Sequence, residues 1–300
     1  MSAAGSLATL RRGRAAQRRG RTAPRRGRAP RRVFRGGAGA LCALAWLGLA
    51  CALALVPGLE AAALRQDVVA GAHGPAWAGH LLGTDALGRD VWLLTLAGAR
   101  TAVAGPVAVA AGSMAVGLAA GLSAAWRRGA LDWAVSRVTD VLLALPSLLL
   151  AIVVAGVIGG GYWVTVAVFV VLYAPYDVRL VRGAALARIN DPFLEAARLL
   201  ELPARRILAR HLFPVIRGVV GANLFLNMGY ALVGLSSLSF LGLGISPQAA
   251  DWGRQLSDAR TLLFSNPAAA VAPGVAIILT AVSLNAVGDW IAEKSGAAEE

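Results

Sequence analysis

The sequence predicts an all-α membrane protein with six transmembrane helices, on the basis of two features. Hydrophobic residues make up 57% of the 300-residue chain and the mean hydropathy is +0.64, yet the formal net charge is +13. The apolar residues stand in long blocks, and 29 of the charged residues are basic. This combination is typical of an integral membrane protein with basic segments on its cytoplasmic side.

The apolar blocks are long enough to span a bilayer, which takes about 20 helical residues. The run 141–176 would measure about 54 Å as one helix, so the glycines at 159–161 are expected to divide it into two spans. The first part of the run 218–250 is interpreted as one span, and 239–247 as a Gly/Pro-broken loop at the membrane surface. The predicted spans are 36–59, 101–126, 141–158, 162–179, the first part of 218–250, and 261–288.

The charges of the connecting loops predict which side of the membrane each end of these spans faces. Arginines gather in the connections 127–140 and 177–217, whereas the connection 239–266 holds two arginines balanced by two aspartates. Basic loops stay in the cytoplasm, so the sequence predicts that both termini lie inside. Residues 36–289 then form the membrane domain, and 290–300 form a short cytoplasmic tail.

The first 35 residues contain 12 arginines and no acidic residue, and they are expected to be disordered. A nucleic-acid-binding arm, an organelle transit peptide and a cytoplasmic anchor on anionic membrane lipid all fit this composition. Nothing else in the chain is suited to reading bases, so the lipid anchor is favoured and no nucleic-acid partner is expected.

Cys42 and Cys51 are too few for a disulfide scaffold. On one helix they are nine residues apart and face opposite sides, so they are not expected to bridge each other.

The segment 191–214 is a polar, arginine-rich stretch between apolar blocks, and its pattern fits two helices. Asp191 is a suitable N-cap, Pro192 suits the first helical position, and Glu195 falls in the first turn, where the helix dipole favours an acid. A second helix is expected to start at Pro203. Its apolar face comprises Ile207, Leu208, His211 and Leu212, opposite Arg205, Arg206 and Arg210. Pattern alone fits a docking hairpin and a solvated basic loop equally well.

This segment resembles the cytoplasmic EAA loop of bacterial ABC-transporter permeases. The matching residues are Glu195, Ala196, Ala197, Ile207, His211 and Pro214. The resemblance implies that the ATP-binding subunit acts on the membrane subunit here. Glu201 stands where the family usually has a glycine. Since glutamate does not readily adopt a positive φ, we expect the corner to be built differently, with help from Pro203.

A second resemblance narrows the branch to the dipeptide, oligopeptide and nickel permeases. The segment His80–Asp90 looks like the stretch before the second span of that branch, and 239–244, 251–253 and 285–289 fit it too. The motif residues are Leu82, Gly83, Thr84, Asp85, Gly88, Arg89 and Asp90.

From the residues themselves, Thr84 or Asp85 is expected to cap a short helix that Gly88 loosens. Trp77 and Trp92 suit the membrane interface. A metal site formed by His73, His80, Asp85 and Asp90 is disfavoured, because the spacing matches no ligand set.

These resemblances imply a multi-pass permease of the bacterial cytoplasmic membrane, similar to type I ABC importers. Its partners would be a related permease forming a heterodimer, two ATP-binding cassette subunits and an extracytoplasmic substrate-binding protein. The cargo would be di- or oligopeptides, or a related solute such as chelated nickel. No cofactor is expected on this chain; ATP and Mg²⁺ would be used by the ATPase subunits, since the sequence has no phosphate-binding loop and its single lysine is Lys294.

Two alternatives from other classes remain. One is a channel or scaffold that works without ATP. The other is an intramembrane protease using Ser236 of Gly234-Leu-Ser236, which is disfavoured because no histidine follows His211. Several polar residues of the spans could line a path or join helices: Asn223, Asn227, Tyr230 and Ser236.

Overall fold

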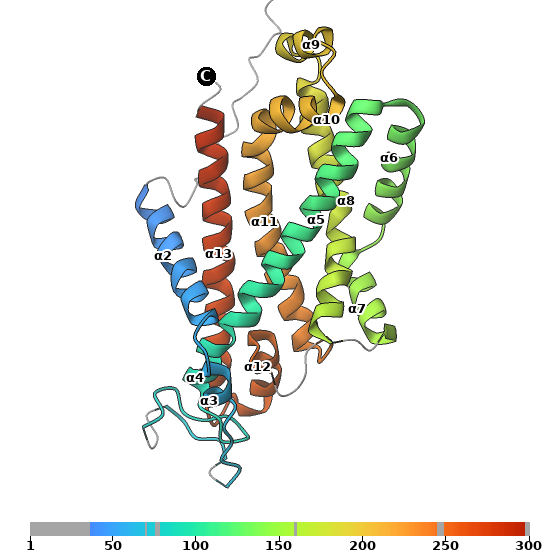
Figure 1. Ribbon diagram of the computed structural model, residues 1–300. Coiled ribbons are helices and arrows are strands. Elements are labelled where there is room, and N and C mark those ends of the chain that lie inside the picture. The colour runs from blue at the N-terminus through green and yellow to red at the C-terminus, as the bar shows by residue number, and fades with distance from the viewer. Residues whose placement is uncertain (1–36, 70, 76–78, 159–160, 245–248, 298–300) are drawn as a thin grey trace, which may run out of the picture. The chain divides into compact units, whose positions relative to one another are not determined.

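The computed structural model describes residues 37–69, 71–75, 79–158, 161–244 and 249–297. The arginine-rich tail, Trp77 and two of the three glycines at 159–161 lie outside these ranges. The regular elements of the described residues are helices, which are joined by loops (Figure 1). Their bounds are α2 Gly37–Ala54, α3 Leu59–Ala63, α4 Val91–Ala97, α5 Ala99–Arg127, α6 Gly129–Leu143, α7 Ser147–Ile158, α8 Tyr162–Arg188, α9 Pro192–Leu199, α10 Ala204–Ile207, a π-helical turn Leu208–Leu212, α11 Phe213–Phe240, α12 Trp252–Asp258, a 3₁₀ turn Ala259–Leu262 and α13 Ala268–Ala297.

Four segments of the described chain are long and apolar enough to cross a membrane, which confirms an all-helical membrane protein. They are Val91–Arg127, Tyr162–Arg188, Ala204–Phe240 and Ala268–Ser295. A fifth is counted if the bent pair α6–α7 is one span. The 18 residues of α2 measure about 27 Å, slightly less than the hydrocarbon core of about 30 Å.

The predicted third span, 141–158, is not one straight helix. Helix α6 ends at Leu143, α7 starts at Ser147, and the two are bent by 82°. Pro146 explains the break, because proline disfavours helical geometry in the residue before it and lacks a backbone N–H. The 12 residues of α7 extend only about 18 Å.

Helices α5 and α8 pack closely because glycines of α5 face α8. A Cβ at Gly117 would lie 2.5 Å from the Cβ of Asp177, and one at Gly121 would lie 3.0 Å from the backbone nitrogen of Arg182. Small residues at such contacts let helix backbones approach within a membrane. An alanine at Gly117 would force the two helices apart.

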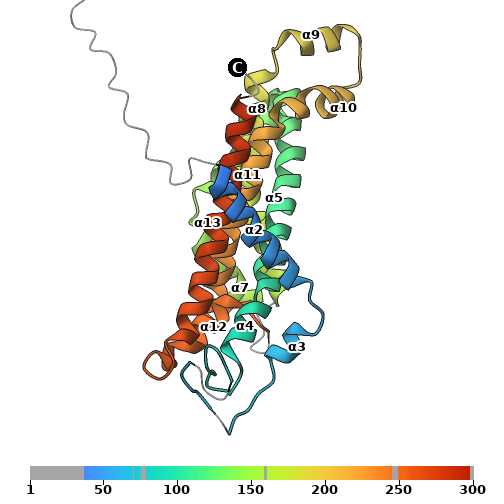
Figure 2. The same ribbon diagram turned by 90° about the vertical axis from the view of Figure 1, so that its left-hand side faces the viewer.

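Helix α13 packs against α11 and α2. The indole N–H of Trp46 on α2 donates to the hydroxyl of Thr280 on α13 at 3.0 Å. The two ends of the bundle differ (Figures 1 and 2): α9 and α10 project at one end, whereas α3, α4 and α12 lie at the other.

Candidate functional site

The segment 191–214, called the hairpin below, connects the end of α8 to the start of α11. Its first helix, α9, begins at Pro192, and Glu195 lies in its first turn as predicted. The predicted capping role of the Asp191 side chain is wrong: it makes no cap hydrogen bond and lies 3.8 Å from Arg188 instead. The Asp191 carbonyl accepts the N–H of Leu194 at 2.9 Å, so the backbone begins the helix without that cap.

Helix α9 has one buried and one exposed face. Leu194 and Ala197 are buried in the core formed by α5, α8 and α11. Glu195 and Ala196 are exposed, and Leu199 is 85% exposed at the tip. The exposed face of α9 therefore presents one acid, one small residue and one uncovered leucine.

The corner after α9 forms the hydrogen-bond pattern of a Schellman motif. Glu201 N–H donates to the carbonyl of Arg198 at 2.9 Å, and Leu202 N–H to that of Ala197 at 3.4 Å. Glu201 itself has φ +54°, the left-handed conformation that glycine usually supplies. The expectation that the corner is built differently is therefore wrong: the geometry that favours glycine is kept, and glutamate occupies it.

The second half of the hairpin begins after Pro203, as predicted. It runs through α10 and a π-helical turn straight into α11, rather than ending as a separate helix. Ile207 and Leu212 are buried in the same core as Leu194, and the three arginines face solvent, so the predicted faces are confirmed. His211 is half-buried, and Pro214 is in the first turn of α11.

Arg198 fastens the hairpin to the bundle. Its guanidinium lies 4.6 Å from the ring centroid of Trp126 at the end of α5, and it donates to the carbonyl of Ile189 at 3.3 Å. Together with the buried face of α9, these contacts tie the hairpin to α5, α8 and α11. The hairpin therefore packs directly on three long helices.

The described residues of 59–97 and 249–267, called the lobe below, occupy the opposite end and contain the second motif. Gly83 and Gly88 both have φ +72°, and added Cβ atoms would lie 2.1 Å from the His73 carbonyl oxygen and 1.9 Å from that of Asp67. Thr84 pairs with Asp90 in an isolated β-bridge. Both glycines are therefore needed for the tight turn, and Gly88 does not loosen a helix.

The predicted helix cap in this motif is displaced. Asp90, rather than Thr84 or Asp85, caps α4 by accepting the N–H of Leu93 at 2.9 Å. Asp85 instead accepts the backbone N–H groups of Leu87 and Arg89 at 2.9 Å each. The two acids are thus turn and cap residues.

Arg89 ties the motif to α12. Its guanidinium lies 2.6 Å from the Asp85 carboxylate and 3.4 Å from that of Asp258, and the side chains of Arg89 and Asp85 are only 5% and 8% exposed. Nearby, the Asn266 amide donates to the carbonyls of Leu82 and Thr84 at 2.9 and 3.1 Å. The motif is therefore a structural link between distant parts of the chain.

Asp251 caps α12 and joins it to α5. Its carboxylate accepts the Arg254 N–H and the Thr101 hydroxyl, both at 3.0 Å. Burial raises the pKa of Asp251, an effect that these hydrogen bonds oppose.

The four residues considered for a metal site are not brought together as ligands. His80 Nδ1 lies 2.6 Å from the Asp90 carboxylate, while Asp85 binds Arg89. Among the described residues, no cluster of three histidine, cysteine or acidic side chains could hold a metal ion.

Comparison with known proteins decides the family. Residues 113–295, which include the hairpin, match the family described as "Binding-protein-dependent transport system inner membrane component". The chain belongs to this family. It is 35% identical to the glutathione transport system permease protein GsiD of Pectobacterium atrosepticum over 219 residues, covering 73% of this chain and 72% of the relative. It is also 35% identical to GsiD of Escherichia coli O157:H7 over 212 residues, covering 71% and 70%.

The protein is therefore an ABC-transporter permease of the peptide type, a multi-pass subunit of the bacterial inner membrane. Its relatives are permease subunits, and ATP hydrolysis lies in separate subunits.

The permease contains a buried polar cluster that the sequence analysis missed. Asp177 of α8 is fully buried, and its carboxylate accepts the side-chain amides of Asn223 and Asn227 of α11 at 2.6 Å each. Of the four polar span residues considered above, these two asparagines therefore join helices. The acid near the end of the predicted 162–179 span was the available signal, since ionisable residues inside membrane segments are rare.

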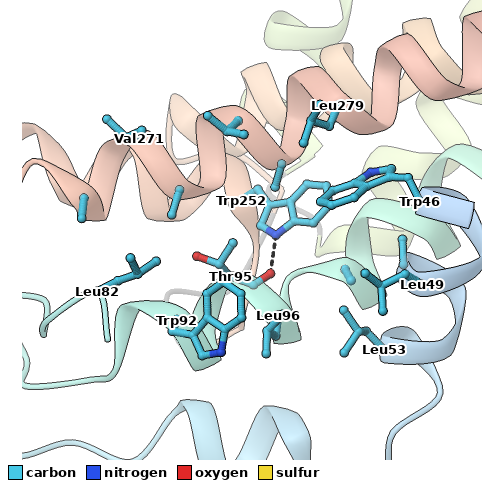
Figure 3. Close-up of a pocket in the computed structure, with 16 residues that line it drawn as sticks. Trp46, Leu49, Leu53, Leu82, Trp92, Thr95, Leu96, Trp252, Val271 and Leu279 are labelled. Atoms are coloured by element: carbon cyan, nitrogen blue, oxygen red, sulfur yellow. Dashed lines mark hydrogen bonds between the residues drawn. The ribbon is translucent and has the colours of Figure 1, made fainter. Parts of the chain in front are cut away.

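An apolar pocket of about 460 Å³ lies between α2, α4, α12 and α13 (Figure 3). Trp46, Trp92 and Trp252 are among its walls. Thr95 also lines the pocket. The Thr95 hydroxyl donates to the Val91 carbonyl at 2.8 Å. The Thr95 backbone carbonyl accepts the indole N–H of Trp252 at 2.7 Å. The lining is mainly aliphatic and aromatic and suits hydrocarbon, so we do not assign the transport path to this pocket.

Proposed function

We propose that this permease is the membrane subunit of an ATP-driven importer of peptides, and that the hairpin couples it to the ATPase. The observation that carries the proposal is the hairpin's construction. Its exposed face presents Glu195, Ala196 and Leu199, while its buried face is continuous with the core of the bundle. A partner docked on that face can shift α5, α8 and α11 as one body.

The names of the relatives support the class of cargo, and the family description supports a binding-protein partner. They are named as permease proteins of a glutathione transport system, and glutathione is a small peptide. We propose a heterodimer with a related permease, two ATP-binding cassette subunits that use ATP and Mg²⁺, and an extracytoplasmic substrate-binding protein. The permease itself carries no cofactor in this scheme, and the lobe faces the binding protein.

The proposed topology has six spans: α2, α5, the bent pair α6–α7, α8, α11 and α13. Both termini and the hairpin then lie in the cytoplasm, and the lobe lies outside, in agreement with the loop arginines. We expect a cysteine at Phe264, which is fully exposed, to react with a membrane-impermeant thiol reagent added outside, in a Cys42→Ser/Cys51→Ser background. A cysteine at Ala204 should react only after the membrane is opened, and labelling of Ala204 from outside would overturn the topology.

Reconstitution tests the function. The permease, its partner permease and the ATPase subunits are placed in liposomes with a binding protein loaded with glutathione or another small peptide. We expect peptide uptake that needs both ATP and the binding protein. Uptake without ATP would instead favour a channel, and the absence of any binding protein or peptide that stimulates ATP hydrolysis would contradict the proposal.

A further inference from the structure

Three of the four tyrosines of the chain gather on one face of α8 and α11. The rings of Tyr173 and Tyr176 are 6.5 Å apart between centroids at 83°, and Phe169 extends the row at 5.6 Å from Tyr173. Tyr230 of α11 lies one helical turn before Gly234, where an added Cβ would lie 3.4 Å from the Tyr173 hydroxyl. Two helices thus contribute to one aromatic cluster.

The cluster lies near the middle of α8, and two of its rings, Tyr176 and Tyr230, are uncovered. Tyr176 comes 14 residues after the start of α8 and 12 before its end, about 21 and 18 Å along the helix. Tyr176 is 51% exposed and Tyr230 is 64% exposed. Tyrosines that contact lipid favour the membrane–water interfaces, where the hydroxyl reaches water. Exposed hydroxyls this far from both ends of α8 therefore favour a surface that does not face hydrocarbon.

Contacts of neighbouring residues hold α8 and α11 in the orientation that exposes these tyrosines. Asp177, next to Tyr176, is held by Asn223 and Asn227, and Asn227 lies less than one turn from Tyr230. This buried cluster fixes the rotation of both helices, and in that arrangement Tyr176 and Tyr230 are largely exposed. A Cβ on Gly234 would lie 2.6 Å from the Phe169 ring and 3.4 Å from the Tyr173 hydroxyl, so glycine makes room for the row against α11.

The chemistry of the surface suits a peptide better than a packed helix. Contacts between membrane helices are rich in small residues, as at Gly117 and Gly121, whereas this face carries bulky rings. Phenol hydroxyls donate to and accept from peptide amides, and the ring faces accept varied apolar side chains without a fixed charge. A row of such groups would hold a passing peptide weakly and with little dependence on its sequence.

We propose that Tyr173, Tyr176 and Tyr230 line the translocation path and contact the peptide during its passage. This inference rests on the proposed function and names the cargo-contacting surface within it.

Cysteine accessibility in the assembled, reconstituted complex tests the location. Tyr176→Cys and Tyr230→Cys are made in the Cys42→Ser/Cys51→Ser background, with Val171→Cys as a control that is 61% exposed on α8 but lines a groove beside α6. We expect a charged, water-soluble thiol reagent to modify both tyrosine positions, at rates that change severalfold when ATP and loaded binding protein are added. Val171→Cys should react only with a lipid-soluble maleimide.

Other labelling results overturn the inference. Reaction of the tyrosine positions with the lipid-soluble reagent alone would place them against lipid. Protection from both reagents, with cross-linking to the partner permease, would make this face a subunit interface. If the parent complex transports peptide in either case, the proposed function stands and only the path assignment fails.

A second measurement tests peptide contact. We expect Tyr176→Ala/Tyr230→Ala to lower the ratio of peptide moved to ATP hydrolysed by about 3- to 10-fold, as lost hydrogen bonds and ring contacts would, while binding-protein-stimulated ATP hydrolysis persists. Tyr162→Phe is the control, because its hydroxyl donates to the Thr101 carbonyl inside the protein. An unchanged ratio in the double variant would overturn the proposal.

Discussion

Replacing Glu195 with arginine is expected to abolish binding-protein-stimulated ATP hydrolysis and peptide uptake while leaving membrane abundance unchanged. Glu195 is exposed in the first turn of α9. A positive charge there destabilises the helix by only about 0.5–1 kcal/mol, too little to unfold the bundle, so the change acts on the surface offered to the ATPase subunit. The measurements are co-purification of the ATPase subunits, stimulated ATP hydrolysis and uptake in liposomes.

Glu201→Gly is the matched control in the same hairpin. It removes a charge of the same sign, yet it relieves the left-handed strain at φ +54°. We expect transport to be unchanged or slightly higher, and amide exchange in α9 to slow by a few fold. Full stimulated activity in the Glu195→Arg complex would show that the hairpin is not the coupling site.

Much of the fold could be predicted because the signals are local. Long apolar runs mark α5, α8, α11 and α13, and the spacing of Ile207 and Leu212 marks the buried side of the hairpin. The bend between α6 and α7 was missed because only the glycines at 159–161 were taken to divide the apolar run. Pro146 interrupts the same run at a second place. Two breaks in one apolar block change the number of straight spans without changing its composition.

The parts that escaped prediction depend on partners far away in the sequence. The burial of Asp177 is explained by the side-chain amides of two residues that come about 50 positions later in the sequence. The burial of Arg89 is explained by two carboxylates, one from its neighbour Asp85 and one from the distant Asp258. Thr84 or Asp85 was expected to cap the helix, but the tight turn at Gly83 and Gly88 places Asp90 at the start of α4 instead. Motif resemblance located Arg89 and its neighbours but not Asp177, and the tertiary contacts show what each of them binds.

Arg89→Ala is expected to destabilise the lobe by about 3–5 kcal/mol, because it leaves the Asp85 carboxylate buried without its countercharge. Asp258 would lose a contact as well, although its side chain is 30% exposed and Arg254 remains 3.0 Å away. The loss should appear as amide exchange at residues 82–94 that is faster by more than about a hundredfold. Helices at the hairpin end should keep their exchange rates.

Two further variants distinguish the effect of breaking the buried Arg89–Asp85 pair from the effect of removing a surface charge. Arg100 pairs with Glu60 at 3.2 Å, but the side chains are 67% and 34% exposed, so Arg100→Ala should change stability by less than about 1 kcal/mol. Adding Asp85→Asn to Arg89→Ala should restore part of the loss, since the amide oxygen still accepts backbone N–H groups while the charge is gone. If Arg89→Ala and Arg100→Ala had equal effects, or if Asp85→Asn restored nothing, burial of an unpaired carboxylate would not be the source of the instability.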